Sequence, residues 1–157
     1  MSRLRLVSNY EVMQSQIELL AGQDIQLEHI HSVQKTKPTL ADSFVLTGGV
    51  AAWGVGTKLE IFATNEVTHP FDIHWVGLGN VNDVGAVYEI ILYSGLVGSE
   101  VEIGHARVFR QANQAGTAPC PMMTPLLPAN TRVSAACAST NGGSKTIEVA
   151  LFYHEYI

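Results

Sequence analysis

Six histidines are the side chains of this 157-residue sequence best suited to metal binding or proton transfer. His29 and His31 are separated by one residue, which on a strand places both imidazoles on the same face. Zinc sites use such pairs but need further ligands, and the sequence does not tie Asp72, His74 or Glu28 to this pair. No histidine has an acid or a nucleophile at a spacing typical of a catalytic triad. We therefore interpret the histidines as structural or surface residues.

Two glutamates, Glu100 and Glu102, are candidates for a pair of catalytic carboxylates. On one strand face they would lie about 7 Å apart, within the range of glycosidases, whose carboxyl groups lie roughly 5–9.5 Å apart. Such pairs normally come from different strands around a cleft, so a solvated strand face is the better interpretation. The Gly54-Val55-Gly56 run lacks the Lys-Ser/Thr of a phosphate-binding loop. We expect no catalytic, cofactor-binding or metal-binding residues, and no enzymatic activity.

The tryptophans and cysteines are the other residues with binding or redox chemistry. Trp75 alternates with Ile73 in a strand-like run, which predicts a buried side chain. Trp53 is flanked by Ala and Gly and is the candidate exposed aromatic, suited to stacking on a sugar. Cys120 and Cys137 lack the CxxC spacing of zinc sites. We expect free thiols in a cytoplasmic product, and a disulfide between sheet neighbours stays open as the alternative.

The composition argues against several classes of partner. Only 15% of the residues are charged and the formal net charge is −5, whereas an average soluble domain has roughly 25% charged residues. Arg3 and Arg5 are the nearest thing to a basic cluster, which argues against nucleic-acid binding. No apolar run reaches the roughly 18 residues of a membrane-spanning helix, and the first residues do not resemble a secretory signal. We expect a soluble protein made in a cytoplasm, whose weakly charged surface is partly covered by partner subunits.

Along the rest of the chain, hydrophobic and polar side chains alternate in several short runs. This period of two residues is typical of half-buried strands. In the last run, Ile147, Val149 and Leu151 share one face, while Glu148 and His154 lie on the other. About eight such runs, bounded by Gly, Pro, Asn and Ser, predict an all-β fold, an antiparallel β-sandwich. The expected strands lie within residues 25–33, 44–46, 58–64, 71–78, 86–95, 99–109, 127–140 and 145–157.

Two connecting segments are predicted to be loops. Residues 79–83 are rich in Gly, Asn and Asp, which favour turns. Residues 111–130 contain four prolines, which cannot donate to a sheet ladder. This second segment is interpreted as a crossover or as a loop that follows a sheet edge.

The first 23 residues predict an N-terminal arm, and residues 24–157 a single β-sandwich domain. Ser8 and Glu11 have the spacing of a helix capping box, but an isolated helix of this length is marginal. The arm is therefore either a short helix or an extended segment, and its apolar side chains need another subunit to pack on. The candidate subunit contacts are Leu4, Leu6, Val12, Ile17, Leu19 and Leu20.

Residues 58–157 resemble a group of structural proteins from tailed bacteriophages. The resemblance is carried, in order, by the segments FDIHWVGLG, YEIILYSGLVGSEVEIG, LLPANTRVSAACAST and TIEVALFYH. In that group a strand ends in a Gly-containing turn followed by GSE, and a segment of the IPAGTR type comes later. Here Asn130 stands where the pattern usually has Gly, and Ala136 where a second Arg is common.

The resemblance implies a jelly-roll-like β-sandwich located in a virion, on the capsid exterior or at the neck. Such proteins commonly form homotrimers that decorate or cement the capsid, so the implied partners are other copies of the chain and the major capsid protein or other virion proteins. One alternative is a carbohydrate-binding module of a tail or fibre that binds sugars through Trp53 and loop Asn and Asp residues, and another is a structural component of the neck or tail. A more distant alternative is a jelly-roll enzyme, which would need a His/Glu metal set.

Overall fold

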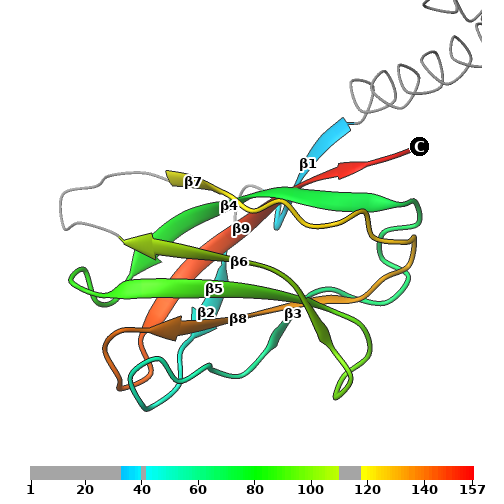
Figure 1. Ribbon diagram of the computed structural model, residues 1–157. Coiled ribbons are helices and arrows are strands. Elements are labelled where there is room, and N and C mark those ends of the chain that lie inside the picture. The colour runs from blue at the N-terminus through cyan, green and yellow to red at the C-terminus, as the bar shows by residue number, and fades with distance from the viewer. Residues whose placement is uncertain (1–32, 40–41, 110–117) are drawn as a thin grey trace, which may run out of the picture. The chain divides into compact units, whose positions relative to one another are not determined.

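Nine β-strands make up the computed structural model, which describes residues 33–39, 42–109 and 118–157 (Figure 1). The pairings between the strands are antiparallel. The described residues contain no helix, and so none long and apolar enough to cross a membrane. The predicted all-β antiparallel fold is confirmed. The strands are β1 (Val33–Lys37), β2 (Phe44–Thr47), β3 (Leu59–Phe62), β4 (Phe71–Val81), β5 (Val87–Ser94), β6 (Val101–Phe109), β7 (Ala118–Pro121), β8 (Val133–Ser139) and β9 (Thr146–Glu155).

The strands form two sheets in the order of a jelly roll. Sheet A has the order β1-β9-β4-β7, with β2 also pairing with β9, and sheet B has the order β3-β8-β5-β6. β1 and β2 follow each other along the same edge of β9, so they act as one interrupted strand. β9, the last strand, thus pairs with the first strand. Nested inside this pair, β3 pairs with β8, β4 with β7 and β5 with β6. This nesting is the double Greek key of a jelly roll.

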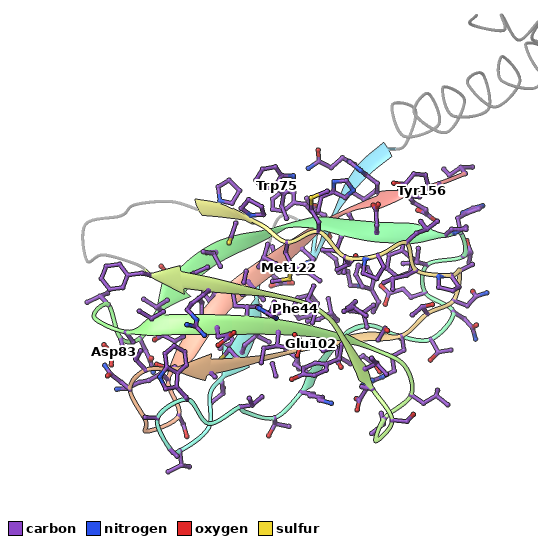
Figure 2. All side chains as sticks on the ribbon, viewed as in Figure 1. Phe44, Trp75, Asp83, Glu102, Met122 and Tyr156 are labelled. Carbon is purple, nitrogen blue, oxygen red and sulfur yellow. The ribbon has the colours of Figure 1, made fainter. Side chains whose placement is uncertain are left out.

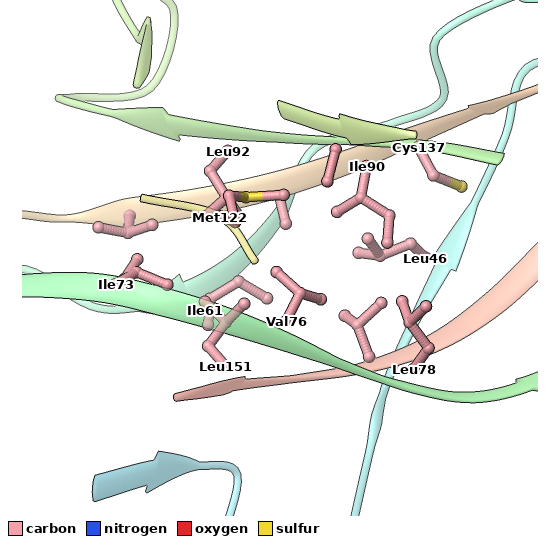
Figure 3. Close-up of a cluster of buried hydrophobic side chains, with 14 of the residues drawn as sticks. Leu46, Ile61, Ile73, Val76, Leu78, Ile90, Leu92, Met122, Cys137 and Leu151 are labelled. Carbon is pink, nitrogen blue, oxygen red and sulfur yellow. The ribbon is translucent and has the colours of Figure 1, made fainter. Parts of the chain in front are cut away.

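Side chains from the inner faces of both sheets meet in one core (Figure 3). In β9, Ile147, Val149 and Leu151 are at most 1% exposed, so the predicted alternation is confirmed. From sheet B, Ile90 and Leu92 are fully buried opposite them. Burying each such side chain stabilises the fold by about 1.5–3 kcal/mol relative to leaving it exposed. Mutual burial of the two inner faces therefore holds the sheets together.

The prediction of loops at residues 79–83 and 111–130 is wrong in part, because strand pairing includes some of these residues in β4 and β7. β4 continues through Gly79 to Val81 because it keeps pairing with β9, and the Glu148 carboxylate accepts hydrogen bonds from both the backbone and the side-chain nitrogens of Asn80, each at 3.1 Å. The proline-rich segment contains β7, which lies beside β4 at the edge of sheet A. An edge strand tolerates proline because its outer side needs no N–H donor. In both places strand pairing overrides the local turn preference.

Two of the segments that carry the resemblance, residues 88–104 and 126–140, meet at one corner of the sandwich. Asn130 has a φ of 65°, in the left-handed region that Gly and Asn tolerate best, which explains an Asn at a position that is usually Gly. Arg132 donates to Glu60 Oε2 at 2.6 Å and to Glu100 Oε1 at 3.0 Å. It also donates to the Gly95 carbonyl at 3.2 Å. The motif residues therefore anchor the start of β8 to β3 and to the β5–β6 turn, which is a structural role.

This corner keeps the Glu100 carboxylate ionised. Burial raises the pKa of Glu100, but hydrogen bonds from Lys58, from the Gly98 N–H and from Arg132 outweigh burial and lower the pKa to about 2. In the unfolded chain a glutamate has a pKa of about 4.3. A pKa that is lower in the folded state stabilises the fold above the unfolded value, and this contribution disappears as the pH falls toward the folded value.

The first prediction concerns the pH dependence that follows from this corner. The melting temperature of the wild type should fall as the pH is lowered from about 5 to about 2, and Glu100→Gln should flatten that part of the profile. At pH 7 the same variant should melt at a lower temperature, because Arg132 loses a charged partner. Glu102→Gln, at a carboxylate that pairs with His105 instead, is the control. Parallel profiles for wild type and Glu100→Gln would contradict the assignment.

The second prediction tests the register of β9. Val149→Asp should abolish soluble folding, because Val149 is 1% exposed and an unpaired buried carboxylate costs several kcal/mol, comparable to the stability of a whole domain. Val97→Asp makes the same substitution in the β5–β6 turn, where Val97 is 78% exposed, and should change the free energy of unfolding by less than about 0.5 kcal/mol. Soluble yield and thermal melts compare the two. Similar behaviour of both variants would show that the register is wrong.

Candidate functional site

A β-bulge in β4 determines which side chains reach the outer face of sheet A. β4 pairs with β9 residue by residue up to Ile73, and the next pair involves Trp75, so His74 is an extra residue. Beyond the bulge Val76 is buried, whereas Trp75 is 40% exposed. Figure 2 shows Trp75 on the outer side of sheet A and Met122 between the sheets. The prediction of a buried Trp75 is wrong because it assumed an unbroken alternation from Ile73.

An open groove with a volume of about 290 Å³ lies on this outer face. Four strands contribute to it, and its walls are mainly apolar because they are made by two aromatic rings, a proline ring and a glycine. The lining residues are Gln34 of β1, Trp75 and Gly77 of β4, Pro119 of β7 and Phe152 of β9.

The apolar surface extends from the groove to the edge of sheet A. Pro121 of β7 is the cross-strand partner of Trp75. Met123, two residues further along this edge, is 79% exposed. We call the surface made by Trp75, Phe152, Pro119, Pro121 and Met123 the apolar face. Contiguous exposed apolar surface of this kind marks interaction sites more often than the scattered apolar residues of an ordinary surface.

Three polar side chains form a cluster on the same side of sheet A. Asp72 of β4 and His154 of β9 are cross-strand partners, and the bulge places His74 beside them. His74 Nε2 lies 2.8 Å from Asp72 Oδ1, and His154 Nδ1 lies 4.0 Å from the same oxygen. The two imidazole rings have their centroids 4.2 Å apart. Gln34, which lines the groove, is paired across β1 and β9 with His154, so the cluster adjoins the groove.

The outer face of sheet B carries charged side chains beside exposed apolar ones such as Phe109, which is 51% exposed. Arg107 of β6 forms an ion pair with Glu89 of β5 at 3.0 Å, and its guanidinium carbon lies 4.9 Å from the centre of the Trp53 ring. Trp53 is 42% exposed and has a φ of 57°, a strained conformation for a bulky residue. The backbone N–H of Trp53 donates to the Ser139 carbonyl at 2.6 Å. Trp53 is thus a surface residue with one neighbour stacked over its ring.

Other residues singled out in the sequence do not come together as a site. Glu100 binds Arg132 and Lys58, whereas Glu102 pairs with His105 at 2.6 Å, so the two carboxylates have separate partners. The HxH pair and the six candidate subunit contacts lie outside the described residues, as does the predicted boundary between the arm and the sandwich.

The two cysteines lie in different sheets. Cys120 belongs to β7 in sheet A and Cys137 to β8 in sheet B, and both are free thiols. Burial raises the pKa of Cys137 to about 11 and also raises that of Cys120. Both thiols are therefore poor nucleophiles at neutral pH, because the thiolate is the reactive form.

The cluster of Asp72, His74 and His154 was not predicted from the sequence. The sequence placed Asp72 and His74 among possible metal ligands, and the structure brings them together with His154. The period-two spacing puts Asp72 and His74 on one strand face, and His154 on the outer face of the last strand. The spacing of these residues along the chain does not show that β4 and β9 are neighbouring strands.

The chain is similar in strand arrangement to parts of two virus structures. No family model and no curated protein matches it. A chain in the structure of infectious bursal disease virus Gx strain matches with a TM-score of 0.46 and 13% identity, covering 80% of this chain and 32% of that one. The Gt strain of the same virus gives 0.43 and 13%, covering 80% of this chain and 33% of that one. Both of these neighbours are viral, and neither comes from a tailed bacteriophage. This chain spans about a third of their length. A likeness of this strength concerns strand arrangement alone.

Proposed function

We propose that this chain is a non-enzymatic structural protein of a virion that decorates or cements the capsid by bridging its subunits. Its partners are then other copies of itself, in a homotrimer, and the major capsid protein or another virion protein. The observation that carries the proposal is the apolar face of sheet A. The resemblance of residues 58–157 to structural proteins of tailed bacteriophages supplies the class of particle.

The apolar face has the composition of a protein-binding surface. An antiparallel sheet with one face toward solvent normally carries polar side chains there, yet Trp75 on the outer side of sheet A (Figure 2) is 40% exposed, and Met123, just beyond the end of β7, is 79% exposed. Aromatic residues and methionine are enriched in the cores of protein interfaces, where charged residues are depleted. On sheet B, by contrast, ion pairs such as Glu89–Arg107 occupy the outer face. Sheet A is therefore the better candidate for contact with another protein.

Cementing needs only binding that is selective for the assembled shell. A ligand that binds the shell and not its separated subunits stabilises the shell by RT ln(1 + [L]/Kd), about 2.7 kcal/mol per site at a hundredfold excess over Kd. An apolar contact surface also makes binding insensitive to salt, because few ion pairs are available for screening.

The third prediction tests the particle role and the surface together. Particles that carry the wild-type chain should rupture at a higher temperature than particles without it. Trp75→Ser should weaken binding to the particle by about 2 kcal/mol, roughly thirtyfold, as expected for a central interface aromatic. Phe109→Ser is the matched control, since Phe109 is an aromatic on β6 of sheet B that is 51% exposed. Co-sedimentation and rupture temperature are the measurements.

The possible outcomes separate the parts of this proposal. Equal rupture temperatures with and without the chain would contradict cementing. Equal loss of binding in Trp75→Ser and Phe109→Ser would contradict the choice of sheet A. Light scattering of the free chain at micromolar concentration should give the mass of a trimer, and a clean monomer would contradict self-association.

The exposure of Trp53 favours one alternative, a carbohydrate-binding module that docks sugars on this ring. The Arg107 guanidinium lies over the Trp53 ring and contributes both a cation and hydrogen-bond donors next to a sugar-stacking surface. The fourth prediction, which applies to this alternative, is that a glycan array detects binding that Trp53→Ala abolishes and Trp75→Ser leaves intact. An array without signal, together with raised particle stability, would exclude the alternative.

A further inference from the structure

We propose that Asp72, His74 and His154 bind a divalent transition-metal ion on the outer face of sheet A. One carboxylate and two imidazoles converge there, and one donor atom from each residue lies within 4.8 Å of the other two. Each side chain is between 14% and 18% exposed. The side chains are thus largely enclosed by the fold, and the atoms Asp72 Oδ1 and His154 Nδ1 are themselves buried.

The distances suit a common central ion. Ligand atoms bonded to zinc at about 2.0–2.1 Å in a tetrahedral arrangement lie about 3.3 Å from each other. The separation of His74 Nε2 from Asp72 Oδ1 is 2.8 Å and that of His154 Nδ1 from Asp72 Oδ1 is 4.0 Å, which are on either side of this value. Each of the two separations differs from this value by less than about 1 Å.

The three residues are held by a rigid part of the sheet. Asp72 and His154 face each other across the β4–β9 ladder, so their relative position is set by backbone hydrogen bonds. The bulge turns His74 to the same side as Asp72, although the next residue, Trp75, also points outward. Bulges often re-aim a side chain in this way beside functional sites.

The chemistry of the donors selects a class of ion. Imidazole nitrogens favour Zn²⁺, Cu²⁺, Ni²⁺ and Fe²⁺, whereas Ca²⁺ and Mg²⁺ prefer oxygen ligands. The rings of His74 and His154 have their centroids only 4.2 Å apart, so two protonated imidazoles would repel each other there. A metal ion binds both in the neutral form, and the Asp72 carboxylate offsets part of its charge.

Three protein ligands leave part of the coordination sphere open. Zinc sites with three protein ligands complete their coordination with water or an incoming group. The cluster adjoins the groove through Gln34, so a donor atom of a partner bound in the groove is the candidate for the remaining position. The inference rests on the cluster alone, so it stands or falls independently of the proposed role in a particle.

The fifth prediction is that the full-length chain, freed of divalent ions with EDTA and then dialysed, binds one equivalent of Zn²⁺ in a calorimetric titration. Zn²⁺ should also raise the melting temperature, while Ca²⁺ should not. Co²⁺ should give visible absorption bands from nitrogen and oxygen ligands in a four- or five-coordinate site. His154→Asn and His74→Asn should each weaken Zn²⁺ binding at least about tenfold, since loss of even an outer-shell partner costs 10–100-fold.

Two controls locate the ion. His105→Asn removes a histidine that also pairs with a carboxylate, Glu102 at 2.6 Å, and should leave Zn²⁺ binding unchanged. The double variant His29→Asn/His31→Asn removes the HxH pair and should also leave it unchanged. Circular dichroism verifies that each variant is folded. Absence of Zn²⁺ binding by the wild type, or binding that survives both His74→Asn and His154→Asn, would overturn the proposal.

Discussion

The antiparallel ladder between β4 and β9 is the constraint on which most of this structure depends. β9 pairs with β4 on one side and with β1 and β2 on the other, which makes it an interior strand of sheet A. Its inner residues, such as Val149 and Leu151, belong to the core, and its outer residues Phe152 and His154 belong to the groove and the polar cluster. A slip of one residue would exchange these two sets, so one register determines both the core and the surface.

The two outer faces of the sandwich are built differently, and this difference bears on function. β8, inside sheet B, is buried on both sides, because its outward residues Ser134, Ala136 and Ala138 are small. Longer side chains of neighbouring strands cover these small residues of β8, among them Arg107 in its ion pair with Glu89. On the outer face of sheet A, aromatic and proline side chains line a groove. A protein with a single kind of outer surface would offer no basis for preferring one face as the contact.

Two residues of the segments that resemble phage structural proteins, Asn130 and Arg132, have structural roles. Asn130 adopts the left-handed backbone conformation of a turn, and Arg132 joins β3, the β5–β6 turn and the start of β8 through Glu60, Gly95 and Glu100. Buried ion pairs of this sort are costly to break singly, because the remaining charge is left without a partner. These two residues preserve a corner of the fold, whereas residues 71–79 and 146–154, which carry the same resemblance, contribute Trp75 and Phe152 to the apolar face.

The fold class and the core face of the last strand could be predicted from the amino-acid sequence, because the alternation that places Ile147, Val149 and Leu151 inside is a local property of the chain. The sequence also showed that Asp72 and His74 share a strand face. Three features required the folded structure: Trp75 is exposed, a proline-rich segment supplies edge strand β7, and His154 lies beside Asp72. A bulge and the order of strands in a sheet depend on long-range pairing, which local periodicity does not encode.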